Sequence, residues 1–286
     1  MHVYNKERSN HAKLYKSFLK MKDLGIGVFD SGIGGLTAVK AISEFMPGEN
    51  IIYFGDTLRM PYGNKNTEDI LCFADQNIRF LESMGVKVIV AACGTVSSYI
   101  ERLNSNVPIF EVITPACKAA VKVTKNSKIG VIGTTAAIKS NSYLNCISEI
   151  QRNVKCWQRD CPLLASLIED GNIEYTNEDL KKNLDSYISP LIKKGIDTLV
   201  LGCTHYPVVQ PVIKKMFGDK LNLIDPSREL AIALKKFFID NHLNKAEEKM
   251  GNHNFYVSGD PEKFSLNAEQ FLNREITVKN INIEAY

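Results

Sequence analysis

The chain has 286 residues, of which 44% are apolar and 23% charged, so it is globular and long enough for one large domain or two ordinary ones. A net charge of +3 is too small to indicate a nucleic acid or membrane partner, and no run reaches the roughly 18 apolar residues of a membrane span. Seven cysteines without a C-x-x-C pair favour reduced thiols over disulfides, so we expect a cytoplasmic protein.

Residues 1–23 form a basic segment ahead of the first predicted strand. The segment has no long apolar core and no small-residue cleavage site, so it does not resemble a secretory signal. Three interpretations stay open: Met21 is the true start, the segment is an added helix that regulates the protein or binds a partner, or it is a tail.

From Leu24 onward, short runs of strand composition alternate with longer amphipathic runs. This order is typical of βαβ units, which build a parallel sheet covered by helices. Strands with apolar residues at nearly every position indicate a sheet buried on both faces. The first such runs are GIGVFD, LTAVKAISEFM, NIIYFGD, EDILCFADQNIRFLESMG and VKVIVAA.

The pattern begins again at KIGVIGTT, which is similar to GIGVFDSG, and a second apolar run ends at Cys203 as the first ends at Cys93. The similar spacings predict two related α/β halves. Ligands bind at the carboxyl ends of parallel strands, so we expect Cys93 and Cys203 to face one cleft.

Cys93 precedes a short polar turn that opens a helix, where the positive end of the helix dipole favours a thiolate. The alternative is a buried structural cysteine. Cys203 is followed by His205, a side chain suited to proton exchange near neutral pH. A cysteine peptidase pair and a zinc site formed by Cys93, Cys203 and His205 are further alternatives.

Two acidic residues end other predicted strands. Asp30 and Ser31 begin D-S-G-I-G-G, which matches neither a phosphate loop nor a dinucleotide fingerprint. Asp56 precedes a Pro-Tyr-Gly turn that can direct backbone N–H groups at an anion. Each segment alone is also compatible with an ordinary turn. Two opposed thiols with nearby acids and an imidazole, however, suit removal of a proton from one face of a carbon and its return on the other.

Six motifs in order resemble the glutamate racemase family: GVFDSGIGGLT, YFGDTLRMPYGNK, AACGTVSS, GVIGTTAAIKS, CPLLASLIEDG and LGCTHYP. The resemblance implies a cofactor-independent and metal-independent isomerase that makes D-glutamate for peptidoglycan, with a small-molecule substrate and a possible homodimer. It also implies two α/β domains with the active site in the cleft between them. The expected domains are residues 24–116 with 227–286, and residues 117–226.

The same resemblance assigns roles to individual residues. Cys93 would be the base for D-glutamate, assisted by Asp30 and Asp56. Cys203 would be the base for L-glutamate, assisted by Glu169 and His205. The implied substrate-binding residues are Asp30, Ser31, Pro61, Tyr62, Gly63, Cys93, Gly94, Thr95, Thr134, Cys203, Thr204 and His205.

Two residues depart from the family pattern. Gly94 stands where the family usually has Asn, and Ala137 stands where it often has Thr. Gly94 removes one amide donor to the substrate, so the details of carboxylate recognition are expected to differ from those of the family. Two alternatives accompany the glutamate assignment: an aspartate or other amino-acid racemase of the same superfamily, and a non-catalytic dicarboxylate-binding or regulatory protein on the same fold.

Overall fold

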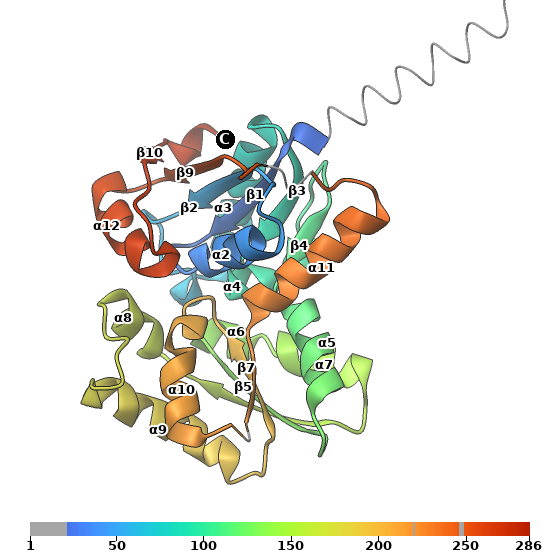
Figure 1. The fold of residues 1–286 in the computed structure, drawn as a ribbon, viewed down its shortest axis with the longest axis vertical. Helices are drawn as coiled ribbons and strands as arrows, with labels where there is room; N and C mark the ends of the chain where they lie inside the picture. Colours follow the sequence, from blue (N-terminus) through green and yellow to red (C-terminus); the bar gives the residue numbers. More distant parts are fainter. Residues whose placement is uncertain (1–21, 220, 246–248) are drawn as a thin grey trace, which may run out of the picture.

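The computed structural model describes residues 22–286 except 220 and 246–248, and it contains two parallel β-sheets flanked by helices (Figure 1). Residues 1–21 of the expected N-terminal extension lie outside the described residues. No helix in the described part of the chain is long and apolar enough to cross a membrane.

The larger sheet has six strands in the order β10-β9-β2-β1-β3-β4, and all its paired strands are parallel. Its central strands are buried at every position, as the apolar runs predict. The strands are β1 (Gly25–Asp30), β2 (Ile51–Gly55), β3 (Val86–Ala91), β4 (Ile109–Glu111), β9 (His253–Val257) and β10 (Val278–Asn280).

Helices cover both faces of this sheet. On one face, Ile26 and Val28 of β1 share a core with Leu36 of α2 and Leu230 of α11. On the other face, Phe29 shares a second core with residues of α3. The helices around this sheet are α2 (Leu36–Phe45), α3 (Thr67–Ser83), α4 (Gly94–Ser97), α11 (Pro226–Asp240) and α12 (Pro261–Leu272), with 3₁₀ turns η1 (Tyr62–Asn64), η2 (Ile100–Arg102) and η4 (Ile283–Ala285).

The smaller sheet has four parallel strands in the order β6-β5-β7-β8. Its strands are β5 (Lys128–Gly133), β6 (Lys155–Asp160), β7 (Thr198–Gly202) and β8 (Asn222–Ile224). The helices in this part of the chain are α5 (Ile113–Val123), α6 (Thr135–Lys139), α7 (Ser142–Ile150), α8 (Leu164–Glu169), α9 (Glu178–Ile192), η3 (Tyr206–Val209) and α10 (Gln210–Phe217).

The chain passes from the larger sheet to the smaller one through α5 and returns through α11, which pack against each other (Figure 1). The chain leaves the larger sheet somewhere between β4 and β5 and returns to it somewhere between β8 and β9, and the sheets do not define these points more closely. The expected domain boundaries at Ala116 and Pro226 therefore stay a prediction.

The two sheets repeat one strand order. In the larger sheet β2-β1-β3-β4 are neighbours, and in the smaller sheet β6-β5-β7-β8 follow the same sequence of connections. The strand β3, which ends just before Cys93, therefore corresponds to β7, which ends just before Cys203. The α/β architecture with two similar parallel sheets, predicted from the sequence, is confirmed, and each cysteine follows the equivalent strand of its sheet.

Candidate active site

A cavity of about 310 Å³ lies where the carboxyl ends of strands from both sheets meet. This volume is at the small end of the range for small-molecule sites, roughly 300–1,000 Å³. Its lining comes from the segments that follow strands of both sheets: Asp30, Ser31, Gly32, Met60, Pro61, Tyr62, Gly63, Asn64, Cys93, Gly94, Thr95, Thr134, Thr135, Cys161, Pro162, Ala165, Ser166, Glu169, Gly202, Cys203, Thr204 and His205.

Cys93 is the residue that precedes the first turn of α4, and its Sγ lies 3.7 Å from Ser31 Oγ. Burial, followed by the negative charge of Asp30, raises the pKa of this thiol to about 12. The backbone N–H groups of α4 act in the opposite direction but are outweighed. The sequence-based expectation that the helix start would favour a thiolate at Cys93 is therefore wrong, because desolvation of the buried thiol exceeds the effect of the helix dipole.

Asp30 is buried beside Cys93 at the end of β1. Its Oδ2 accepts hydrogen bonds from the backbone N–H of Gly35 (2.9 Å) and of Gly32 (3.3 Å). Burial raises the pKa of the carboxyl group, while the positive charge of His205 lowers it. Its Oδ1 is buried and has no hydrogen-bond partner among the residues that the structure describes. An unpaired buried carboxylate oxygen is costly, so it marks a place where a ligand donor would be stabilised.

Cys203 faces an imidazole that is itself held by a carboxylate. Its Sγ lies 3.5 Å from His205 Nδ1, and His205 Nε2 lies 2.8 Å from Glu169 Oε1. Burial alone lowers the pKa of His205, but the hydrogen bonds and charges of Cys203 and Glu169 outweigh it and raise that pKa well above its usual 6.5. The resulting imidazolium can give a proton to the sulfur or stabilise a negative charge on it.

The turn after β1, which carries Asp30, approaches the Cys203 loop closely at Gly34. A Cβ at Gly34 would lie 2.4 Å from Thr204 Oγ1 and 2.6 Å from His205 Cε1, so only glycine fits there. Thr37 reinforces this approach, because its Oγ1 donates to the carbonyl oxygen of Thr204 at 2.9 Å. The glycine-rich turn after β1 is therefore packed against the Cys203 loop.

Of the expected site residues, all of which the structure describes, Asp56 alone does not line the cavity. It is fully buried beneath the loop that carries Tyr62, and its carboxylate accepts hydrogen bonds from Tyr62, Arg59 and Ser258. The other expected catalytic and substrate-binding residues are brought together around the cavity.

Several lining residues were not among the expected site residues. Pro162, Ala165 and Ser166 come from the turn before α8 and from α8 itself, and Cys161 precedes them. The CPLLASLIEDG motif, which also contains Glu169, was the signal for this group. Met60, Asn64 and Thr135 flank expected residues and belong to the PYGNK and GTT segments.

The two departures from the family pattern have different surroundings. A Cβ at Gly94 would lie 3.2 Å from the carbonyl oxygen of Gly202, so this position is tight. Ala137 is buried outside the lining, and its backbone N–H donates to Thr134 Oγ1 at 3.3 Å. No group of three His, Cys, Asp or Glu side chains suited to a metal ion occurs within the described ranges.

The chain is similar to known proteins over most of its length. The family model for Asp/Glu/hydantoin racemases matches residues 36–234. Glutamate racemase from Thermoanaerobacter pseudethanolicus is 40% identical over 91% of this chain and 98% of its own length. A glutamate racemase isoform from Bacillus anthracis superposes with a TM-score of 0.85 at 34% identity, covering 91% of this chain and 98% of that one.

A second solved structure, glutamate racemase from Francisella tularensis in complex with D-glutamate, has a TM-score of 0.84 at 35% identity. It covers 93% of this chain and 100% of the other. The sequence match and the fold match both extend over nearly the whole length of these relatives. The chain is therefore a member of the glutamate racemase family.

Proposed function

We propose that this protein interconverts L-glutamate and D-glutamate by transfer of the α-proton between two thiols, without a cofactor. The observation that carries the proposal is the placement of Cys93 and Cys203 at equivalent strand ends around one cavity. The named relatives, including one structure with D-glutamate bound, support glutamate as the substrate.

The reaction needs one thiolate and one thiol at the start of each turnover. With D-glutamate, the Cys93 thiolate removes the α-proton and the Cys203 thiol gives its proton to the opposite face. With L-glutamate the two cysteines exchange these roles. The protons balance, because one sulfur gains the proton that leaves the substrate while the other loses one.

Each thiol has a different set of partners for this task. His205, held by Glu169, supports charge on Cys203 and exchanges a proton with it. Burial and the charge of Asp30 raise the pKa of Cys93, which favours its thiol form. Conversion of Cys93 to a thiolate is therefore coupled to substrate binding, because a substrate ammonium would offset the charge of Asp30.

The substrate's charged groups have complementary groups in the lining. The unpartnered Oδ1 of Asp30 suits the ammonium group. The hydroxyl groups of Ser31, Thr95, Thr134 and Thr204, together with the loop at Tyr62 and Gly63, suit the two carboxylates. Donors at the α-carboxylate also stabilise the enolate-like charge that develops as the proton leaves.

The wider role follows from the family resemblance. We place the activity in the cytoplasm, where it supplies D-glutamate for peptidoglycan, and we propose a homodimer with domains at residues 24–116 plus 227–286 and at 117–226. Size-exclusion chromatography with light scattering tests the dimer.

Isotope exchange tests the proposed reaction. Purified protein in deuterated buffer, without cofactor and with a chelator, should racemise either enantiomer of glutamate and place deuterium at Cα, as followed by NMR and optical rotation. Cys93→Ser and Cys203→Ser should each lower racemisation by at least about a thousandfold. Exchange of aspartate but not glutamate would move the substrate assignment, and binding of glutamate without any exchange would support the dicarboxylate-binding alternative.

A further inference from the structure

The described residues after His205 do not line the cavity, yet the segment after β9 contacts the loop at residues 56–64, which does. Ser258 follows β9 and is buried at 8% exposure. Its Oγ donates to Asp56 Oδ1 at 2.8 Å and accepts from the backbone N–H of Leu58 at 2.9 Å. Both contacts join positions 200 or more residues apart in the sequence.

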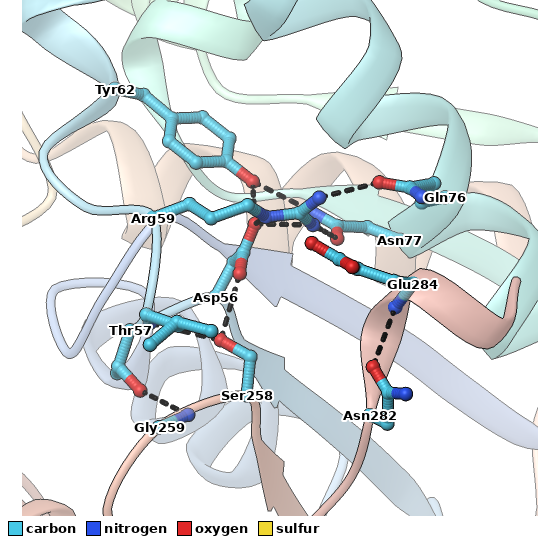
Figure 2. A network of polar contacts seen from close by, with 11 residues as sticks. Asp56, Thr57, Arg59, Tyr62, Gln76, Asn77, Ser258, Gly259, Asn282 and Glu284 are labelled. Carbon is cyan, nitrogen blue, oxygen red and sulfur yellow. Dashed lines mark hydrogen bonds and ion pairs between the residues drawn. The ribbon is translucent and has the colours of Figure 1, made fainter.

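Asp56 connects Ser258 to the loop at residues 60–64, as Figure 2 shows. Its Oδ2 accepts from the Tyr62 hydroxyl and forms an ion pair with Arg59 at 2.7 Å. Asn77 of α3 donates to the Tyr62 hydroxyl at 3.2 Å. Asp56, Tyr62 and Asn77 are all fully buried, so their contacts are little screened by water.

This arrangement fixes how the loop faces the cavity. The Tyr62 ring is turned into the core, where it packs against Phe73 with ring centroids 5.5 Å apart. Met60, Pro61, Gly63 and Asn64 flank it and line the cavity. Burial and the charge of Asp56 raise the pKa of Tyr62, so its hydroxyl keeps the proton that it donates.

A second contact holds the start of the same loop. The backbone N–H of Gly259 donates to Thr57 Oγ1 at 3.1 Å, and a Cβ at Gly259 would lie 2.7 Å from that oxygen. Ser258 and Gly259 therefore contact three consecutive residues at the start of the loop, Asp56, Thr57 and Leu58. Ser258 and Gly259 lie outside residues 36–234, the range that the family model matches.

We propose that Ser258 is a positioning residue for substrate binding: through Asp56 and Tyr62 it holds the loop at residues 60–64 in the orientation that receives a substrate carboxylate. The inference rests on the proposed function, since that function makes this loop part of the glutamate site. In this proposal the loop binds the substrate equally well in the ground state and in the transition state. Loss of Ser258 should therefore raise KM and leave kcat, which reports the proton transfer, nearly unchanged.

Ser258→Ala, compared with Ser265→Ala, tests the proposal. Ser265 is a matched control because it lies in the same C-terminal segment and its Oγ donates at 2.8 Å to the carbonyl oxygen of Ile276, away from the loop. We expect Ser258→Ala to raise KM for both enantiomers about tenfold and to change kcat less than about twofold. Ser265→Ala should change neither constant, and Ser258→Thr, which keeps the hydroxyl, should restore KM.

A double-mutant cycle with Tyr62→Phe tests whether the effect passes through Asp56. Because Ser258 and Tyr62 share that carboxylate, the rise in KM of the double variant should be smaller than the product of the two single rises. Equal effects of Ser258→Ala and Ser265→Ala on KM would overturn the proposal, as would a fall in kcat with unchanged KM.

Hydrogen–deuterium exchange separates this inference from the proposed function. Backbone amides of residues 57–66 should exchange faster in Ser258→Ala than in the unaltered protein or in Ser265→Ala, whether or not glutamate is turned over. Faster exchange in a protein that does not racemise glutamate would overturn the proposed function alone. Unchanged exchange and KM in an active racemase would overturn the positioning role alone.

Discussion

Glu169 Oε1 lies 2.8 Å from His205 Nε2, so a carboxylate of α8 orients the imidazole that faces Cys203. This contact also raises the pKa of His205. Glu169→Gln keeps a hydrogen-bond acceptor but removes the charge, so the pKa of His205 should fall. We expect kcat to fall about tenfold, less than the roughly 10²–10⁴-fold that a direct acid or base contributes, because Glu169 acts through His205.

The pH profile gives the sign of this effect. A raised pKa keeps His205 protonated to higher pH, so the alkaline limb of activity should move to lower pH in Glu169→Gln. Asp170→Asn is the control, because Asp170 is the adjacent carboxylate, is exposed and does not line the cavity. An unmoved alkaline limb in Glu169→Gln would show that Glu169 does not act through His205.

Alkylation of Cys93 by iodoacetamide should report its raised pKa. The thiol form predominates at pH 8, so modification should be slow and should accelerate as pH rises toward about 12. Asp30→Asn removes a charge that raises this pKa, and each unit by which the pKa falls increases the thiolate fraction about tenfold. Faster modification of Cys93 at fixed pH is therefore expected, measured by peptide mass spectrometry.

Exposed Cys72 serves as the internal standard for that experiment. Its modification should be the same in both proteins. If Asp30→Asn leaves the Cys93 rate unchanged relative to Cys72, the charge of Asp30 does not control this thiol.

Gly34→Ala should separate the two loops that carry the catalytic groups, because the new Cβ would lie 2.4 Å from Thr204 Oγ1. A displacement of this kind can cost on the order of a hundredfold, which we expect in kcat/KM. Gly25→Ala is the control, since its Cβ would meet its nearest atom at an ordinary 3.4 Å. If kcat/KM were comparable in the two variants, the close contact of Gly34 with Thr204 and His205 would not be needed for activity.

Lys87 of β3 should stabilise the packing of the segment after α11 against the larger sheet. Its Nζ is buried and contacts Glu49 Oε2 at 2.6 Å and the carbonyl oxygen of Leu243 at 2.9 Å. Lys87→Ala leaves a buried carboxylate without its partner, which typically costs about 3–5 kcal/mol in free energy of unfolding. Urea denaturation measures this loss.

Lys181→Ala is the comparison, because Lys181 pairs with Glu178 at the surface. Exposed pairs contribute little, so this variant should unfold at nearly the same urea concentration as the unaltered protein. If Lys87→Ala also unfolded at nearly the same urea concentration as the unaltered protein, water would have replaced the lost ammonium group.

The sequence predicted the parts of the site that local pattern determines. Apolar strands followed by small polar turns identified the segments at Asp30, Cys93 and Cys203, and the structure brings these strand ends together. The state of the Cys93 thiol was not predictable in this way. Its pKa depends on how completely distant segments exclude water from it, and the helix-start pattern contains no such information.

Asp56 shows a second limit of sequence patterns. Asp56 directly follows β2 and Asp30 is the last residue of β1, so the two carboxylates look equivalent along the chain. Tertiary contacts distinguish them: Asp56 is enclosed by Tyr62, Arg59 and Ser258, while one oxygen of Asp30 is left without a partner among the described residues. Ser258 itself carried no signal, because a single serine after a strand is common in loops.

The pairing of β2 with β9 joins Ile51 to His253, whereas the four strands of the smaller sheet lie in one continuous stretch between Lys128 and Ile224. During synthesis, the ribosome therefore adds every strand of the smaller sheet to the chain before it adds β9. Pairing between distant segments forms slowly, because a long loop must close first. We expect the smaller sheet to fold first and the larger sheet to wait for the last 34 or so residues, so that a truncated chain lacks the substrate loop's support.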